Sequence, residues 1–325
     1  MRSGFDSSIT IGTREVKYNF KKAKVKNKPI LFVLHGHGHH DKPASFRSDD
    51  WNIVCPLDCY GVEGKGTWYL GELGDFFWIS AMRLIIDEVR KECGDGRLYF
   101  WGSSMGGYGA LLHGYLNNAA AVYANIPQTF LLGSRYSDGG ASRYFDGILA
   151  HGSLYNDLKN IFLESTETLI FLCFNQLERD KYFSEQGLSF ISHLESINQK
   201  MYVEVRPLST HGVNHKIWET VELFKSYDST IDPDSWLLKV DAHREGSTVV
   251  ARSVINEKHF ENGVDYAFYL MVNGVRVDVR WYTDDPCATL IIPDDLSCES
   301  IRVQGYVRDK NDEKRKFLEI ARIKL

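Results

Sequence analysis

Residues 97–116 read RLYFWGSSMGGYGALLHGYL, and this stretch decides the fold of the 325-residue chain. Residues 97–101 predict a buried strand, and residues 105–116 predict a helix that begins directly after it. Between them lies Gly102-Ser103-Ser104-Met105-Gly106, a G-x-S-x-G turn. In such a turn the serine stands on a sharp corner, and the first amides of the helix point toward it. The pattern therefore predicts that Ser104 is a nucleophile.

Strands and helices alternate on both sides of this corner. The run at 30–34 is apolar on both faces, as in a strand buried in a parallel sheet, and further strands are predicted at 51–54, 119–124, 168–174 and 201–205. Helical periodicity occurs at 75–93, 184–197 and 215–227. The alternation predicts a doubly wound, mostly parallel sheet. Together with the serine corner, it predicts an α/β-hydrolase catalytic domain over residues 1–228.

The pattern changes after a polar link at 229–234 (STIDPD). Beyond it every periodic segment alternates as a strand does, and Asn273-Gly274 between two such segments is a strong hairpin signal. About seven short strands in this region are typical of a small sandwich. The sequence therefore predicts an all-β sandwich accessory domain over residues 235–325.

Composition and charge exclude several classes of function. Asp and Glu number 43 against 38 Lys and Arg, a net charge of −5, so the chain lacks the basic surplus with which proteins neutralise nucleic-acid phosphates. No stretch reaches the roughly 20 apolar residues of a membrane span, and the N-terminal residues lack the apolar core of a secretory signal. We expect a cytoplasmic protein with no nucleic-acid partner, no membrane span and six free cysteines.

The order of elements in this fold predicts where the catalytic acid lies. It follows the next-but-one strand after the nucleophile, which is the strand at 168–174. Asp180 is the predicted acid, because aspartate is the usual residue and the surrounding loop is charged. Glu178 and Asn175 are the alternatives. The acid would orient the catalytic histidine and stabilise its protonated form.

The histidine comes last in the same order. His211 lies in the loop ahead of the final helix and is the predicted base, and His215, on that helix, is the alternative. The amides of Met105 and His37 are the predicted oxyanion donors, since they come from the corner and from the loop after the strand at 30–34.

That loop supports a second interpretation. It reads His35-Gly36-His37-Gly38-His39-His40-Asp41, which is similar to the H-x-H-x-D-H metal site of metallo-β-lactamase-type hydrolases. His39 stands where that motif has aspartate, and the chain carries a complete serine corner elsewhere. We therefore predict neither a metal nor a tightly bound cofactor.

Several segments resemble the α/β-hydrolase-type O-acetyltransferases that modify bacterial capsular polysaccharides. They are Lys65-Gly66-Thr67-Trp68-Tyr69, Gly71-Glu72-Leu73-Gly74-Asp75, the Ser104 corner with Gly109-Ala110-Leu111-Leu112, Asn125-Ile126-Pro127-Gln128 and the surroundings of His211. The resemblance implies that Ser104 takes an acetyl group from acetyl-CoA and passes it to a sugar hydroxyl, with Asp180 and His211 completing the triad. Residues 175–178 depart from the pattern, and the β-rich tail lies outside the shared region.

Three functions remain open, because a fold does not fix its chemistry. The favoured one is acyl transfer to a bacterial surface polysaccharide through an acyl-Ser104 intermediate. A carbohydrate or small-ester esterase with water as acceptor is the alternative, and an inactive glycan-binding or scaffold protein is the third. Trp68 and Tyr69 are predicted to contact the substrate. The tail's aromatic residues form either a sugar platform, a core or a homo-oligomer contact: Trp236, Tyr266, Phe268, Tyr269, Trp281, Tyr282 and Tyr306.

Overall fold

The computed structural model describes residues 4–39, 42–149, 153–227, 239–255, 257, 260–294, 296–312 and 316–323. They form two compact units, Met1–Thr220 and Val221–Leu325. The link predicted at 229–234 lies outside the described residues. The structural division falls earlier than predicted, inside helix α5 (Ile217–Tyr227).

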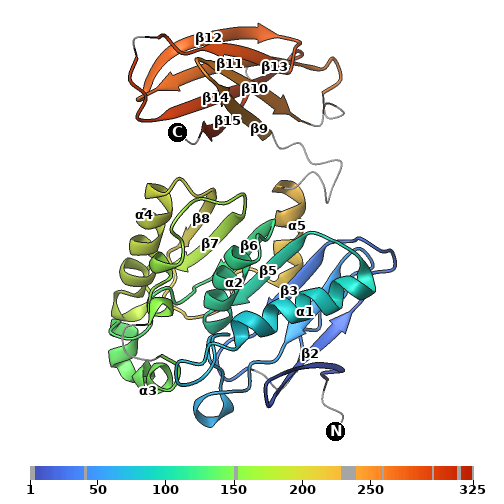
Figure 1. The fold of residues 1–325 in the computed structure, drawn as a ribbon, viewed down its shortest axis with the longest axis vertical. Helices are drawn as coiled ribbons and strands as arrows, with labels where there is room; N and C mark the ends of the chain where they lie inside the picture. Colours follow the sequence, from blue (N-terminus) through green and yellow to red (C-terminus); the bar gives the residue numbers. More distant parts are fainter. Residues whose placement is uncertain are drawn as a thin grey trace. The chain divides into compact units, whose positions relative to one another are not determined.

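An eight-stranded sheet forms the centre of the first unit (Figure 1). Its strand order is β1-β2-β4-β3-β5-β6-β7-β8, and every neighbouring pair from β4 to β8 is parallel. At one edge of the sheet, β2 pairs antiparallel with both of its neighbours, β1 and β4. The strands are β1 (Ser7–Ile11), β2 (Arg14–Lys21), β3 (Ile30–Leu34), β4 (Asn52–Pro56), β5 (Leu98–Ser103), β6 (Ala121–Asn125), β7 (Leu169–Asn175) and β8 (Met201–Arg206).

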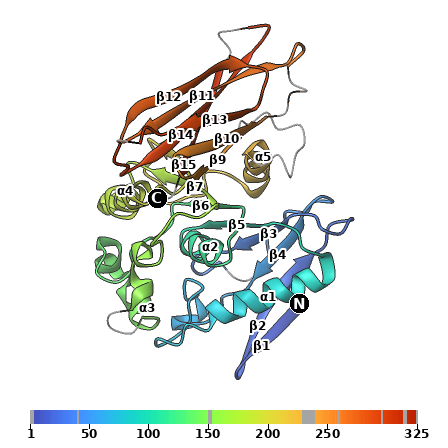
Figure 2. The same ribbon diagram turned by 45° about the horizontal axis from the view of Figure 1, so that its top comes forward.

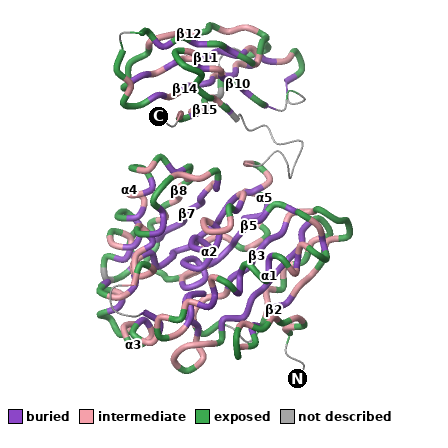
Figure 3. The backbone as a smooth tube through the Cα atoms, viewed as in Figure 1, coloured by how far each residue is buried: buried purple, intermediate pink, exposed green. Residues whose placement is uncertain are grey.

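The central strands form where the sequence has continuous apolar runs. Every residue of β3, β4 and β6 is buried, as Figure 3 shows along the middle of the sheet. These strands confirm the predicted parallel core, with ends shifted by a few residues. Strands β1 and β2 were not predicted, because polar and charged residues interrupt both and leave no apolar run.

The helices of the first unit are α1 (Trp78–Cys93), α2 (Met105–Leu116), α3 (Ser142–Asp146) and α4 (Ser189–Ser196), and α1 and α2 lie on one face of the sheet (Figure 2). The close approach of α2 to Tyr69 depends on a glycine, because a Cβ on Gly109 would lie 2.6 Å from the Tyr69 ring. Short 3₁₀ and π segments complete the unit, namely η1 (Val62–Gly64), η2 (Ser137–Ala141), η3 (Leu154–Asn156), η4 (Leu158–Asn160), η5 (Arg179–Lys181) and η6 (Phe183–Leu188). No helix among the described residues is long and apolar enough to cross a membrane.

The second unit consists of two antiparallel sheets around one core, which is compatible with the predicted sandwich. One sheet has the order β13-β10-β9 and the other β12-β11-β14-β15. The predicted turn at Asn273-Gly274 joins β11 and β12, with φ of 51° and 81°. The strands are β9 (Lys239–Glu245), β10 (Thr248–Val254), β11 (Val264–Val272), β12 (Val275–Thr283), β13 (Cys287–Ile291), β14 (Ile301–Asp309) and β15 (Lys316–Ile323).

The aromatic residues of this unit fall into two groups. Tyr266 and Phe268 are buried in the core. Tyr269 alternates with them along β11, and its ring contacts those of Trp281 and Tyr306, so these three lie on the outer face of the four-stranded sheet. Trp236 lies outside the described residues. All six cysteines of the chain are free thiols.

Candidate active site

Ser104 occupies a corner that only its glycine neighbours allow. Strand β5 ends at Ser103, α2 begins at Met105, and Ser104 between them has a positive φ of 56°. A Cβ on Gly102 would lie 1.9 Å from the carbonyl oxygen of Gly106, and one on Gly106 would lie 2.2 Å from that of Leu34. Such distances are far inside van der Waals contact, so both positions require glycine. The corner fixes the direction of the Ser104 hydroxyl.

His211 and Glu178 complete a hydrogen-bonded triad with this serine. The Ser104 Oγ lies 2.8 Å from His211 Nε2. On the other side of the ring, His211 Nδ1 contacts Glu178 Oε1 in a short hydrogen bond. The Glu178 side chain is 4% exposed, and its second oxygen, Oε2, is buried with no hydrogen-bond partner among the described residues. The two hydrogen bonds connect a serine hydroxyl, an imidazole and a buried carboxylate.

The carboxylate at His211 thus belongs to Glu178 and not to the predicted Asp180. Strand β7 ends at Asn175, and Glu178 is the first carboxylate after it, with a side chain long enough to reach the ring. Asp180 lies in η5, and its side chain is outside the described residues. Asn175, the remaining alternative, donates to the Thr210 carbonyl at 2.6 Å.

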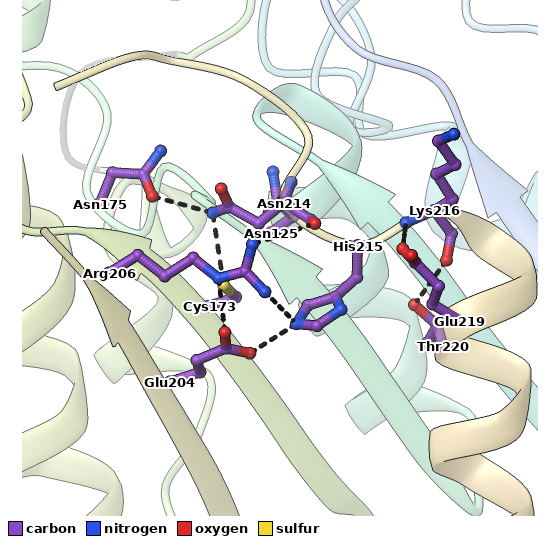
Figure 4. Close-up of polar contacts among 10 residues, drawn as sticks. All are labelled: Asn125, Cys173, Asn175, Glu204, Arg206, Asn214, His215, Lys216, Glu219 and Thr220. Carbon is purple, nitrogen blue, oxygen red and sulfur yellow. Dashed lines mark hydrogen bonds and ion pairs between the residues drawn. The ribbon is translucent and has the colours of Figure 1, made fainter. Parts of the chain in front are cut away.

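Three asparagine side chains hold the loop that carries His211. Asn125 Nδ2 donates to the Gly212 carbonyl at 3.0 Å, and Asn125 Oδ1 accepts the Asn214 amide at 3.1 Å. Asn214 Nδ2 donates in turn to Asn175 Oδ1 at 3.0 Å (Figure 4). Because Asn125 and Asn175 end strands β6 and β7, the sheet itself sets the position of the base.

His215, the alternative base, is committed elsewhere. Its Nε2 lies 2.5 Å from Glu204 Oε2 and 2.9 Å from Arg206 Nη2 (Figure 4). Cys173, Glu204 and His215 form the one group of three or more metal-ligating side chains among the described residues. However, Arg206 Nε also contacts Glu204 at 2.5 Å, so a guanidinium already supplies the positive charge that a metal would bring. We assign this cluster a structural role.

Among the described residues of the histidine-rich loop after β3, the side chains do not gather around a common point. His35 Nε2 accepts the Asp58 amide at 2.9 Å and its Nδ1 contacts the Gly36 carbonyl at 2.9 Å, so both ring nitrogens are engaged. The ring of His37 packs against Trp68 and Tyr144. Burial, and then the positive charge of Lys65, lower the pKa of His37. His40 and Asp41 lie outside the described residues.

The two predicted oxyanion donors lie at the ends of neighbouring strands. Met105 begins α2, and the first amides of a helix have no partner within the helix. His37 follows β3, which pairs with β5 directly before the corner. Farther along this loop, the amide of Gly38 donates to Lys65 and that of His39 to Gly36. The assignment of Met105 and His37 stays a prediction.

Trp68 and Tyr69 are buried, with exposed fractions of 1% and 0%, and their predicted contact with the substrate stays a prediction. The Asp58 carboxylate holds their segment inside, accepting the amides of Thr67 at 2.7 Å and of Tyr69 at 2.9 Å. Burial raises the pKa of Asp58 to about 6. Tyr69 supports the histidine loop, since its hydroxyl accepts the His35 amide at 2.8 Å.

Sequence reasoning noted Gln128 within a shared segment but gave it no role. Its side chain is fully buried, and its Nε2 lies 3.0 Å from Ser104 Oγ. Its Oε1 accepts the indole N–H of Trp68 at 3.0 Å. The only available signal was the segment 125–128 itself, because nothing local reveals where an amide side chain points.

A cavity of about 500 Å³ opens beside Ser104 and His211. Its lining combines apolar residues with polar and charged ones that include His37, His39 and Lys42. This size is typical of a small-molecule site. The apolar part is lined by Val33, Leu34, Pro43, Ala44, Pro56, Trp101, Val213 and Ile217.

Comparisons with known proteins identify the fold of the first unit. No protein-family model and no curated protein matches the chain. Among solved structures, it is similar to the S-formylglutathione hydrolase of Agrobacterium tumefaciens, with a TM-score of 0.51 and 13% identity over 63% of this chain and 87% of that one. It is also similar to dipeptidyl peptidase 4 of Porphyromonas gingivalis, with a TM-score of 0.50 and 15% identity over 69% of this chain.

The chain covers 34% of that peptidase, about a third of its length. A capsule O-acetyltransferase of Neisseria meningitidis serogroup A matches with 20% identity over 70% of this chain and 99% of that one, at a TM-score of 0.48. That score is too low to support an inference. At such identities the likeness establishes the α/β-hydrolase fold alone.

Proposed function

We propose that this chain is a serine acyltransferase that works through an acyl-Ser104 intermediate. The observation that carries the proposal is the direction of the hydrogen bonds through His211. An ionised carboxylate only accepts, so the bond to Glu178 places the ring proton on Nδ1. The lone pair of Nε2 therefore faces the Ser104 hydroxyl at 2.8 Å, ready to take its proton.

The reaction then follows from these positions. Ser104 Oγ attacks the acyl carbonyl while His211 takes its proton, and the oxyanion is held by the amides of Met105 and His37. The intermediate collapses and His211 returns the proton to the leaving group. An acceptor hydroxyl repeats these steps on acyl-Ser104 and releases the serine. Glu178 stabilises the imidazolium in both halves.

For the substrates, we propose acetyl-CoA as donor and a hydroxyl of a bacterial surface polysaccharide as acceptor. The support is the resemblance of the shared segments to capsular O-acetyltransferases. The cavity beside Ser104 is compatible with a donor that has both apolar and negatively charged parts, because its lining combines apolar residues with the cation of Lys42.

An esterase is the second candidate, and one observation favours it. The His211 side chain is 33% exposed, so water has access to the base that would activate it. An acyl-enzyme open to water is hydrolysed unless the acceptor excludes that water.

Intact-protein mass spectrometry after exposure to acetyl-CoA tests the shared step. We expect one added acetyl group, located on Ser104 and missing in Ser104→Ala. Absence of the adduct after rapid quenching, together with unchanged ester cleavage by Ser104→Ala, would contradict the nucleophile assignment. Supplying candidate glycans then separates the two functions, since a transferase yields acetylated glycan and an esterase yields only acetate.

A further inference from the structure

The side chain of Gln128 contacts Ser104 Oγ, and it follows the strand on the other side of β5 from the loop of the predicted donor His37. Strand β5 lies between β3 and β6 in the sheet. The His37 loop follows β3, whereas Gln128 comes three residues after the end of β6. Gln128 Nε2 therefore approaches the serine Oγ itself, at 3.0 Å.

The orientation of this amide follows from its hydrogen bond to Trp68. An indole N–H can only donate, so the Trp68 Nε1 at 3.0 Å identifies the facing atom of Gln128 as the oxygen Oε1. The –NH₂ group must then face Ser104. Trp68 is itself fixed by packing, with its ring edge-on to Phe145 at 4.7 Å between centroids.

Five side chains thus form a series of hydrogen bonds in which each side chain donates to the next one. Trp68 donates to Gln128, Gln128 to Ser104, Ser104 to His211, and His211 to Glu178. The first member can only donate and the last can only accept when ionised, so no link can reverse. Ser104 receives a hydrogen bond on Oγ whenever its own proton points to His211.

We propose that Gln128 is a catalytic residue that makes Ser104 a better leaving group when the acyl group is transferred; this inference rests on the proposed acyl-Ser104 function. A hydroxyl oxygen accepts a hydrogen bond more strongly than the single-bonded oxygen of an ester. The bond from Gln128 therefore weakens when Ser104 is acylated and strengthens when it is freed. Its net effect is to favour the free serine over the acyl-enzyme.

The transfer step shows where the hydrogen bond acts. The acceptor hydroxyl adds to the acyl carbonyl carbon and gives its proton to His211 Nε2. The C–Oγ bond then breaks, and its electron pair goes to Ser104 Oγ, which takes that proton from His211. Negative charge develops on Oγ during this cleavage, and the Gln128 N–H lies 3.0 Å away to stabilise it.

The two half-reactions of the full chain can be measured separately with p-nitrophenyl acetate. Release of nitrophenolate in a rapid burst gives the acylation rate, and decay of the acetyl adduct by mass spectrometry gives the deacylation rate. For Gln128→Leu we expect deacylation to slow about ten- to a hundredfold, with acylation changed only a few-fold. The acetyl-enzyme should accumulate. Equal slowing of both steps, or no change in either, would overturn the inference.

Gln128→Glu is a second variant in case the leucine variant is unstable. It keeps an acceptor for Trp68 but loses the donor to Oγ, so it should show the same bias toward acyl-enzyme. Trp68→Phe keeps an aromatic ring but removes the N–H that orients the amide. We expect Trp68→Phe to slow deacylation more than acylation, by a smaller factor than Gln128→Leu does. When Gln128 is already leucine, Trp68→Phe should have no further effect on the ratio of the two rates.

Gln199→Leu is the matched control. Gln199 is also a buried amide, but its Nε2 donates to the Thr168 carbonyl at 2.5 Å. Thr168 precedes the start of β7, at the end of that strand away from Ser104. The loss of the Gln199 amide should lower stability and leave the ratio of the two rates unchanged. Different results contradict the proposed function and this inference. If the wild type forms no acetyl adduct, the proposed function is contradicted. An adduct that decays equally fast in the wild type and in Gln128→Leu contradicts only this inference.

Discussion

Replacing Glu178 by glutamine, with Asp180→Asn as the matched control, tests which carboxylate serves the catalytic histidine. Glutamine has nearly the size and shape of glutamate, so the buried site should still fold. Its amide presents either an N–H₂ group or an oxygen to His211 Nδ1, where Glu178 Oε1 now accepts. An N–H₂ group there forces the ring proton onto Nε2, and that tautomer cannot take a proton from Ser104.

The size of the effect follows from what the carboxylate does. If the glutamine oxygen faces His211, its N–H₂ group is buried where Oε2 has no partner among the described residues, and the imidazolium loses its counter-charge. In serine proteases, replacing the triad carboxylate by an amide lowers kcat about 10⁴-fold, equivalent to about 5.5 kcal/mol of transition-state stabilisation. We expect a loss of this order for Glu178→Gln and a change below about twofold for Asp180→Asn.

Steady-state hydrolysis of p-nitrophenyl acetate gives kcat and KM for both variants, and thermal melting shows whether each remains folded. The loss for Glu178→Gln should appear in kcat, because the carboxylate acts on the transition state and not on substrate binding. A folded Glu178→Gln enzyme with wild-type kcat, or a thousandfold loss on Asp180→Asn, would refute the assignment of the acid.

Three further changes test the structure around the site. Gly102→Ala should prevent folding, since its Cβ would lie 1.9 Å from the Gly106 carbonyl oxygen; soluble yield and circular dichroism measure this. His113 is fully buried, and burial lowers its pKa to about 4, so its neutral form stabilises the protein above pH 6.5 and this stability is lost as the pH falls toward 4. The stability of the wild type relative to His113→Gln should drop by about 3 kcal/mol between pH 7 and pH 4 in urea denaturation. Asn125→Ala removes two contacts to the base loop and should lower kcat about tenfold with KM unchanged.

The fold and the strand-to-helix corner at Ser104 were predictable because both depend on short-range signals. Strands buried on both faces give uninterrupted apolar runs, and a serine on a strand-to-helix corner needs glycines two positions before and after it. Chain order then indicated His211 correctly as the histidine beside Ser104. The two antiparallel strands β1 and β2 were missed, since their polar and charged residues leave no such run.

Other features of the site depend on contacts that local sequence does not reveal. Glu178 and Asp180 are two residues apart, and only the path of the chain after β7 decides which one reaches the ring. Trp68 and Tyr69 were predicted to contact the substrate from their position in the sequence alone, which does not reveal that a buried carboxylate, Asp58, accepts the amides of Thr67 and Tyr69 and holds this segment inside. Gln128 points at Ser104 because of a tryptophan 60 positions earlier in the chain.

The asparagine anchors of the His211 loop have a consequence for how such an enzyme can diversify. They hold the backbone at Thr210, Gly212 and Asn214 and leave the preceding residues 207–209 without an asparagine anchor. Changes of sequence there need not displace the base, since its position is inherited from the ends of two strands. Substitutions confined to these three residues should therefore leave the rate of serine acylation close to that of the wild type.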